Sequence, residues 1–85
     1  MPRFYFHIVD GSSIADDTGE ELPSIDAAKI EAARLAGAVL SEGIADEIWK
    51  GSPWRVVVSD NPSLGGGRTF LTLTLSAQEQ GIKVG

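Results

Sequence analysis

The segment 25–49, IDAAKIEAARLAGAVLSEGIADEIW, decides the predicted fold of this 85-residue chain. Apolar residues recur in its first half at steps of three and four, the spacing of one face of an α-helix. Ser24 is a candidate N-cap, and Pro23 keeps the preceding chain from being helical. We therefore expect one long, alanine-rich helix from Ile25 to about Trp49, with a break or frayed end near Gly43 as the alternative.

Three segments flanking the helix have the composition of β-strands. Residues 3–9, 54–60 and 68–75 are rich in aromatic and β-branched residues or alternate apolar with polar ones. A short further strand at residues 13–16 follows the turn signal Asp10-Gly11. Alternation separates two faces of the sheet. The face expected to meet the helix holds Phe4, Phe6, Ile8, Trp54, Val56, Val58, Leu71, Leu73 and Leu75, and the opposite face holds Tyr5, His7, Val9, Arg55, Val57, Phe70, Thr72 and Thr74.

These elements predict a two-layer α+β domain. A small antiparallel sheet of three or four strands is covered on one face by the single long helix, in the order βαββ or ββαββ. The domain spans residues 1–76, and residues 77–85 form a partly flexible tail. A chain of this length buries only about two-thirds of its unfolded surface, so nearly every large apolar side chain must enter one core. The opposite face of the sheet is left without a predicted cover.

The charge is divided along the chain. The total is −5, but residues 10–47 hold ten acids against Lys29 and Arg34, whereas the flanking segments are mildly basic. Scattered Lys and Arg residues argue against nucleic-acid binding, which needs a basic cluster. No apolar run is long enough to cross a membrane, and no cysteine is present. We expect a cytoplasmic protein without a thiolate metal site.

Several short motifs occur in an order and spacing that resembles a bacterial family catalogued as domain of unknown function 6894, over residues 2–76. The resemblance implies this fold and a soluble bacterial source, and it carries no established activity. The order of strand, acidic turn and helix is also similar, at the level of the fold, to HicB-type antitoxin domains. The motifs are Pro2-Arg3-Phe4-Tyr5-Phe6-His7, Asp10-Gly11, Asp17-x-Gly19-x-Glu21-Leu22-Pro23, Asp26-Ala27-Ala28, Glu31-Ala32, Trp54-Arg55-Val56-x-Val58-x-Asp60 and Gly67-Arg68.

The sequence indicates no catalytic, cofactor-binding or metal-ligating set. His7 is the natural general base, but a strand histidine on a half-exposed face is the simpler interpretation. The acidic segment 10–21 fails the calcium-loop pattern, because Ala15 stands where glycine is required, and we interpret it as a solvated loop. Residues 65–68 precede a strand rather than a helix, so they predict a flexible hairpin tip and no phosphate loop.

Two apolar surfaces remain as candidates for function. The first is the uncovered sheet face, and the second is the helix side away from the main stripe. They favour a non-enzymatic protein-binding or self-association module, with a homodimer as one form. The alternative is an antitoxin-like regulatory domain that binds a basic partner through the acidic loop and helix, and a third hypothesis is a small enzyme using His7. No nucleic acid, membrane or identifiable small-molecule ligand is expected. The first surface comprises Tyr5, His7, Val9, Arg55, Val57, Phe70 and Thr72, and the second Ile30, Ala33, Gly37 and Ile44.

Overall fold

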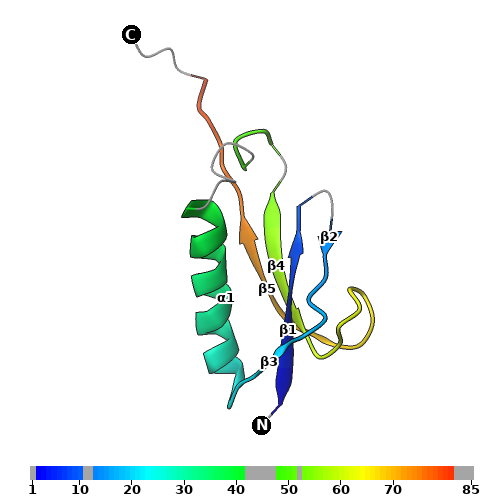
Figure 1. Ribbon diagram of the computed structural model, residues 1–85. Coiled ribbons are helices and arrows are strands. Elements are labelled where there is room, and N and C mark those ends of the chain that lie inside the picture. Colours follow the sequence, from blue (N-terminus) through cyan, green and yellow to red (C-terminus); the bar gives the residue numbers. More distant parts are fainter. Residues whose placement is uncertain (1, 11–12, 42–47, 52, 82–85) are drawn as a thin grey trace.

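Strand β1 (Arg3–Val9) organises an antiparallel sheet beside a single described helix, α1 (Ile25–Val39), in a computed structural model (Figure 1). The structure describes residues 2–10, 13–41, 48–51 and 53–81. The sheet order is β2-β1-β4-β5, and β3 also pairs with β1. The chain is thus a small α+β domain, as predicted. The other strands are β2 (Ser13–Ile14), β3 (Glu20–Glu21), β4 (Trp54–Ser59) and β5 (Thr69–Leu75).

The predicted start of the helix is confirmed, whereas its predicted length is only partly described. Ser24 is the N-cap, and its Oγ accepts a hydrogen bond from the Ala27 N–H at 3.1 Å. Helix α1 ends at Val39, and residues 40–41 continue as a wider π turn. Residues 42–47, including the expected break at Gly43, lie outside the described residues.

Alanines let α1 lie close to the sheet. Ala28, Ala32 and Ala36 are at most 3% exposed and form one core cluster with the buried side chains of Phe4, Val56 and Val58. With only a methyl group at each position, the helix backbone approaches the strands closely. The helix contacts β4 and β5. The helix thus lies mainly over β4 and β5, whereas the predicted cover extends over β1 as well.

A β-bulge in β5 corrects the predicted position of Phe70. Val58 pairs with Leu71 but Ser59 pairs with Thr69, so Phe70 is an extra residue in β5. Alternation alone would place Phe70 beside Thr72, on the face away from the core. The bulge instead turns the Phe70 ring to the Phe4 ring, with centroids 5.3 Å apart and planes at 66°. Phe70 thus packs against the core and leaves the predicted first surface.

The connection between β4 and β5 is a hairpin tip, as predicted, and hydrogen bonds close its base. Asp60 closes it from both sides, because its N–H donates to the Arg68 carbonyl at 3.1 Å and its Oδ1 accepts the Arg68 N–H at 2.7 Å. Gly67 has a φ of 76°, and a Cβ at this residue would collide with Asp60 Oδ1. A glycine is therefore required where the loop returns to β5.

Candidate functional site

The chain from residue 13 to residue 22, called the strap below, runs back along the outer edge of β1. Its ends pair with β1 as β2 and β3, with Ile14 opposite Ile8 and Glu20 opposite Phe4. The sequence predicts the first of these strands, over residues 13–16, but it observably ends at Ile14. Strand β3 was not predicted, because a glycine-containing acidic segment is typical of a solvated loop.

Asp16 holds the middle of the strap against β1 by replacing a strand carbonyl. Its Oδ2 accepts the Phe6 N–H at 3.1 Å, and its Oδ1 accepts the N–H groups of Thr18 and Gly19 at 3.0 and 3.1 Å. Partial burial by itself raises the pKa of the Asp16 carboxyl, but the hydrogen bonds from Gly19, Phe6 and Thr18 outweigh it and hold the pKa below its ordinary value. Asp16, predicted to lie in a solvated loop, instead accepts hydrogen bonds from the backbone and fixes the strap.

The other end of the strap is fixed by Arg3 and by a close approach at Gly19. Arg3 Nη1 donates to the Thr18 carbonyl at 2.9 Å, and Leu22 N–H donates to the Pro2 carbonyl at 3.1 Å. Gly19 has a φ of 74°, and a Cβ there would lie 2.8 Å from a ring carbon of Tyr5. Only glycine lets the strap pass so near to β1.

His7 is fully buried, which corrects the prediction of a half-exposed strand histidine. The strap covers it from one side, where the Asp16 N–H donates to Nδ1 at 3.0 Å. On the other side Nε2 lies 3.0 Å from both Ser59 Oγ and the Asn61 carbonyl. Because Nδ1 accepts, the proton must sit on Nε2, which donates toward Ser59 and Asn61. His7 therefore connects the strap to the end of β4.

The same bonds decide what His7 can do chemically. Ser59, His7 and Asp16 superficially form the trio of a serine hydrolase, but such a trio needs a carboxylate on Nδ1–H and a free lone pair on Nε2. Here Nδ1 is occupied by a backbone N–H rather than the Asp16 carboxylate, and Nε2 carries the proton. Nε2 cannot take the Ser59 proton in this arrangement. The geometry is that of a structural histidine.

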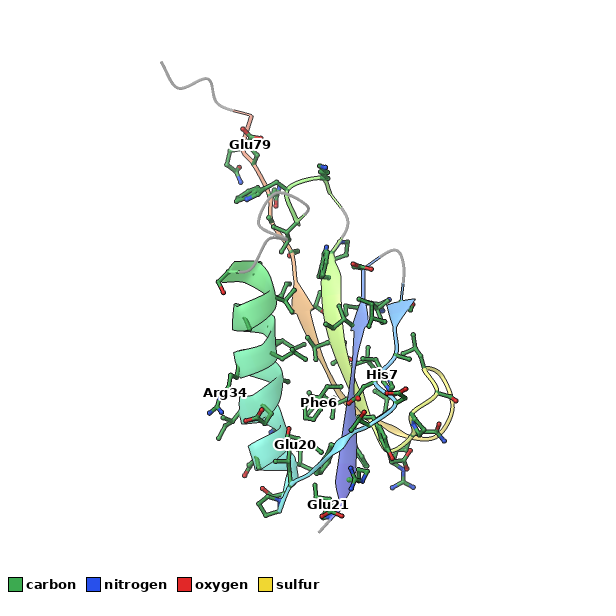
Figure 2. The ribbon with its side chains drawn as sticks, viewed as in Figure 1. Phe6, His7, Glu20, Glu21, Arg34 and Glu79 are labelled. Carbon is green, nitrogen blue, oxygen red and sulfur yellow. The ribbon has the colours of Figure 1, made fainter. Side chains whose placement is uncertain are left out.

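An open groove lies between α1 and the strap, above the part of β1 that the helix leaves uncovered. Its volume is about 420 Å³. Figure 2 shows Phe6 pointing from β1 toward the helix side, whereas His7 points to the other side of the strand. The lining residues are Phe6, Ile8, Ile14, Ala15, Asp16, Asp17, Gly19, Glu20, Glu31 and Leu35.

The groove has an apolar floor and an acidic rim. Its large apolar side chains come from β1, β2 and α1, and every charged side chain that lines it is a carboxylate. Asp16 is engaged by backbone N–H groups, and Glu31 pairs with Arg34 at 3.1 Å on the outer side of the helix. Asp17 and Glu20 form no ion pair with any residue in the described part of the chain.

The structure divides the first predicted surface. His7 is not part of it, because the contacts with the strap bury this side chain. Phe70 is not part of it, because the bulge turns its ring toward the core. Arg55 and Thr72 are exposed, and Tyr5, Val9 and Val57 are half-buried. The remaining residues surround a buried histidine and do not form one continuous apolar face.

The second predicted surface is exposed where the structure describes it. Ile30 is 62% exposed, and Ala33 and Gly37 are also exposed on α1. Ile44 lies outside the described residues.

The groove itself was missed by sequence reasoning. The sequence pattern predicts that Phe6, Ile8 and Leu35 lie in a core covered by the helix. The available signal was the small size of Ala28, Ala32 and Ala36, because a helix presenting mainly methyl groups covers less of a sheet than one presenting leucines.

The fold and the groove define a small α+β domain in which a strap and a helix flank a partly open strand. A family model described as Domain of unknown function (DUF6894) matches residues 3–76, and the chain belongs to this family. No curated protein and no solved structure matches the chain significantly. The likeness to HicB-type antitoxins stays a prediction.

Two further findings concern the described residues. None of their helices is long and apolar enough to cross a membrane. Within the same residues, no group of three or more histidine or carboxylate side chains is arranged to hold a metal ion.

Proposed function

We propose that this domain is a non-enzymatic protein-binding module whose groove holds a basic, partly apolar segment of a partner protein. The observation that carries the proposal is the composition of the groove, in which an apolar floor is combined with charged side chains of one sign. The partner is basic, as in the alternative hypothesis drawn from the sequence. Its binding site is the groove rather than the surface of the acidic loop. A regulatory, antitoxin-like use of such binding remains a hypothesis.

The floor supplies the apolar part of recognition. Ile14 is 60% exposed, and Phe6, Ile8 and Leu35 are each only half-buried although they belong to or adjoin the core side of the sheet. Burying one aliphatic side chain fully is worth about 1.5–3 kcal/mol. A leucine-sized side chain from the partner therefore gains by entering the groove and by covering these residues.

The rim selects a cation beside that apolar side chain. Asp17 and Glu20 have no ion-pair partner in the described residues, and both line the groove. A lysine or arginine next to the inserted side chain meets these carboxylates at the edge of an apolar site. Such rim charges act on association rate and specificity, and they are screened by salt.

The arrangement around His7 supports a binding role rather than catalysis. Its two ring nitrogens are both used in structural hydrogen bonds, and the side chain is fully buried on the opposite side of β1 from the groove floor. A partner in the groove does not reach it.

A titration followed by amide NMR tests the proposal. The probes are two synthetic peptides of equal length, one alternating lysine with leucine and the other alternating glutamate with leucine. We expect the lysine peptide to shift the amide signals of Ile8, Ile14, Glu20 and Leu35, more strongly at low salt than at high salt. The glutamate peptide should leave these signals in place.

A matched pair of charge reversals makes the test specific to the groove. Glu20→Lys and Glu79→Lys change the net charge equally, but Glu79 lies on the C-terminal tail, far from Glu20 (Figure 2). We expect Glu20→Lys to weaken binding about tenfold, a loss of about 1.4 kcal/mol, and Glu79→Lys to have little effect. Equal weakening by both variants would mean nonspecific attraction to an acidic protein, and binding of both peptides would leave no role for the rim.

A further inference from the structure

No strand of the described part of the chain pairs with the outer edge of β5. Strand β5 ends the sheet order and pairs with β4 alone among the described residues. Its sequence from Thr69 to Leu75, TFLTLTL, contains no charged residue and no proline. Charges and prolines are the usual protection of an edge strand against pairing with another chain. This edge lacks both.

The register determines which backbone groups of β1 and β4 face each neighbour. The Phe6 N–H points away from β4, because it donates to Asp16 in the strap. The direction of the backbone N–H and C=O groups alternates along a strand, so those of His7 point toward β4, where His7 pairs with Val57. Val56, one residue away from Val57, must then direct its N–H and C=O toward β5.

The same alternation continues into β5. Leu73 lies opposite Val56 and returns its backbone groups to β4. Thr72 and Thr74 consequently present their N–H and C=O groups to the open edge. Their side chains are exposed, whereas the neighbouring Leu71, Leu73 and Leu75 are half-buried toward the core.

The amino-acid sequence along the exposed edge of β5 is the same in both directions. Residues 71–75 are Leu-Thr-Leu-Thr-Leu, symmetric about Leu73. In an antiparallel pair of two β5 strands related by a two-fold axis at Leu73, Thr72 of each copy faces Thr74 of the other. These are the residues with free backbone groups, so they can exchange both hydrogen bonds. Leucine meets leucine on the core side and threonine meets threonine on the other, both favourable cross-strand pairs.

The flank of α1 above this edge is compatible with a second copy. Ala32 faces the sheet, and Leu35 lines the groove on one side of it. At 100° per residue around the helix axis, Ala33 lies on the other side of Ala32. Ala33 therefore faces the β5 side. Gly37 follows one turn later, with no atom within 4 Å of a Cβ placed there. Small residues allow two helices to approach across the two-fold axis.

We infer that β5 is the site at which two copies of this chain join into one continuous sheet. With the two-fold axis at Leu73, the two strands pair over residues 71–75, a length of about 17 Å at ~3.3 Å per residue. A strip of that length, two layers deep, buries about 300–400 Å² on each copy, which is the size of a weak, transient interface. We therefore expect a weak dimer with a micromolar dissociation constant.

Sedimentation equilibrium of the full chain between about 5 and 500 μM tests the inference. We expect a monomer–dimer equilibrium, and slower hydrogen exchange at Thr72 and Thr74 as the concentration rises. Thr72→Pro should raise the dissociation constant at least tenfold. It removes an N–H that faces outward, so the monomer keeps all its sheet hydrogen bonds and its circular dichroism spectrum.

Two helix variants distinguish this interface from any other. Ala33→Glu should weaken the dimer at least tenfold, whereas Ala38→Glu, an equal change at an exposed position on the groove side of α1, should leave it intact. A monomer throughout the concentration range would overturn the inference. A dimer whose Thr72 and Thr74 exchange rates do not depend on concentration would also overturn it, because it would use another surface.

Discussion

The Asp16 side chain replaces a strand residue as the hydrogen-bond partner of β1. The strap pairs with β1 at both ends, and between them the Asp16 carboxylate accepts the N–H that a strand carbonyl would otherwise take. The same residue donates its own N–H to His7. Loss of its charge therefore loosens the strap, the cover of His7 and one wall of the groove together.

The lowered pKa of Asp16 gives its contribution a definite pH dependence. Since the pKa is lower in the folded than in the unfolded chain, the stabilisation is complete above about pH 5 and is lost as the pH falls through the folded pKa. We expect Asp16→Asn to lower the free energy of unfolding by about 1.5–3 kcal/mol at pH 7. The difference from the wild type should shrink at pH 3, as measured by urea denaturation.

Asp17→Asn is the matched control. Asp17 is exposed, and within the described residues its carboxylate accepts only the neighbouring Thr18 hydroxyl, at 3.2 Å. This variant should change the free energy of unfolding by less than about 0.5 kcal/mol. If the two variants are equally stable, the backbone hydrogen bonds of Asp16 do not fix the strap.

The tautomer of His7 is a second test at this scale. The Asp16 N–H on Nδ1 requires the Nε2–H form, which a ¹⁵N-edited spectrum of the ring identifies directly at neutral pH. Observation of the Nδ1–H form would reverse the hydrogen bonds described above. It would also free Nε2 to act as a base toward Ser59.

Among the elements, α1 depends on the smallness of its buried face. Ala32 is 1% exposed against the sheet. We expect Ala32→Leu to reduce the free energy of unfolding by about 1–3 kcal/mol through overpacking. Ala38→Leu, on the exposed side of the same helix, should cost less than about 0.5 kcal/mol. Thermal and urea denaturation of the two variants measure the difference.

The loop between β4 and β5 contains a matched pair of glycines. Gly65 and Gly67 both have positive φ values, 86° and 76°, but only a Cβ at Gly67 would meet Asp60. Both alanine variants incur the cost of left-handed backbone, about 1–2 kcal/mol. Gly67→Ala should cost clearly more, because it also displaces the carboxylate that closes the loop. Equal costs in urea denaturation would show that the Asp60 contact is unimportant.

Sequence patterns predict the elements of this fold better than the contacts between them. Strand β1 occurs where predicted, and Ser24 caps α1 because its local signals are strong. Alternation misplaces Phe70, because a bulge inserts one residue and no local sequence pattern marks the bulge. Alternation also misjudges the exposure of His7, because its burial depends on contacts with Asp16 and Asn61, which lie 9 and 54 residues away along the chain. Burial of this kind depends on tertiary contacts, not on periodicity.

For the molecule as a whole, the two proposed surfaces lie at opposite edges of the sheet. The groove adjoins β1 and β2, and the open edge belongs to β5. The two activities should therefore be separable. We expect Glu20→Lys to dimerise like the wild type, and Thr72→Pro to bind the lysine–leucine peptide like the wild type in the NMR titration. A variant that lost both activities would indicate that one surface serves both.

The strand order also fixes how far apart two grooves stand when β5 joins two copies. Five strand intervals separate β1 of one copy from β1 of the other, roughly 24 Å at ~4.8 Å each. A partner with two basic segments on a linker that spans this distance gains avidity of 10²–10⁴ over a partner with one, without any new contact. The dimer of a domain too small to enclose a selective pocket can thus distinguish partners by the number of basic segments that they carry.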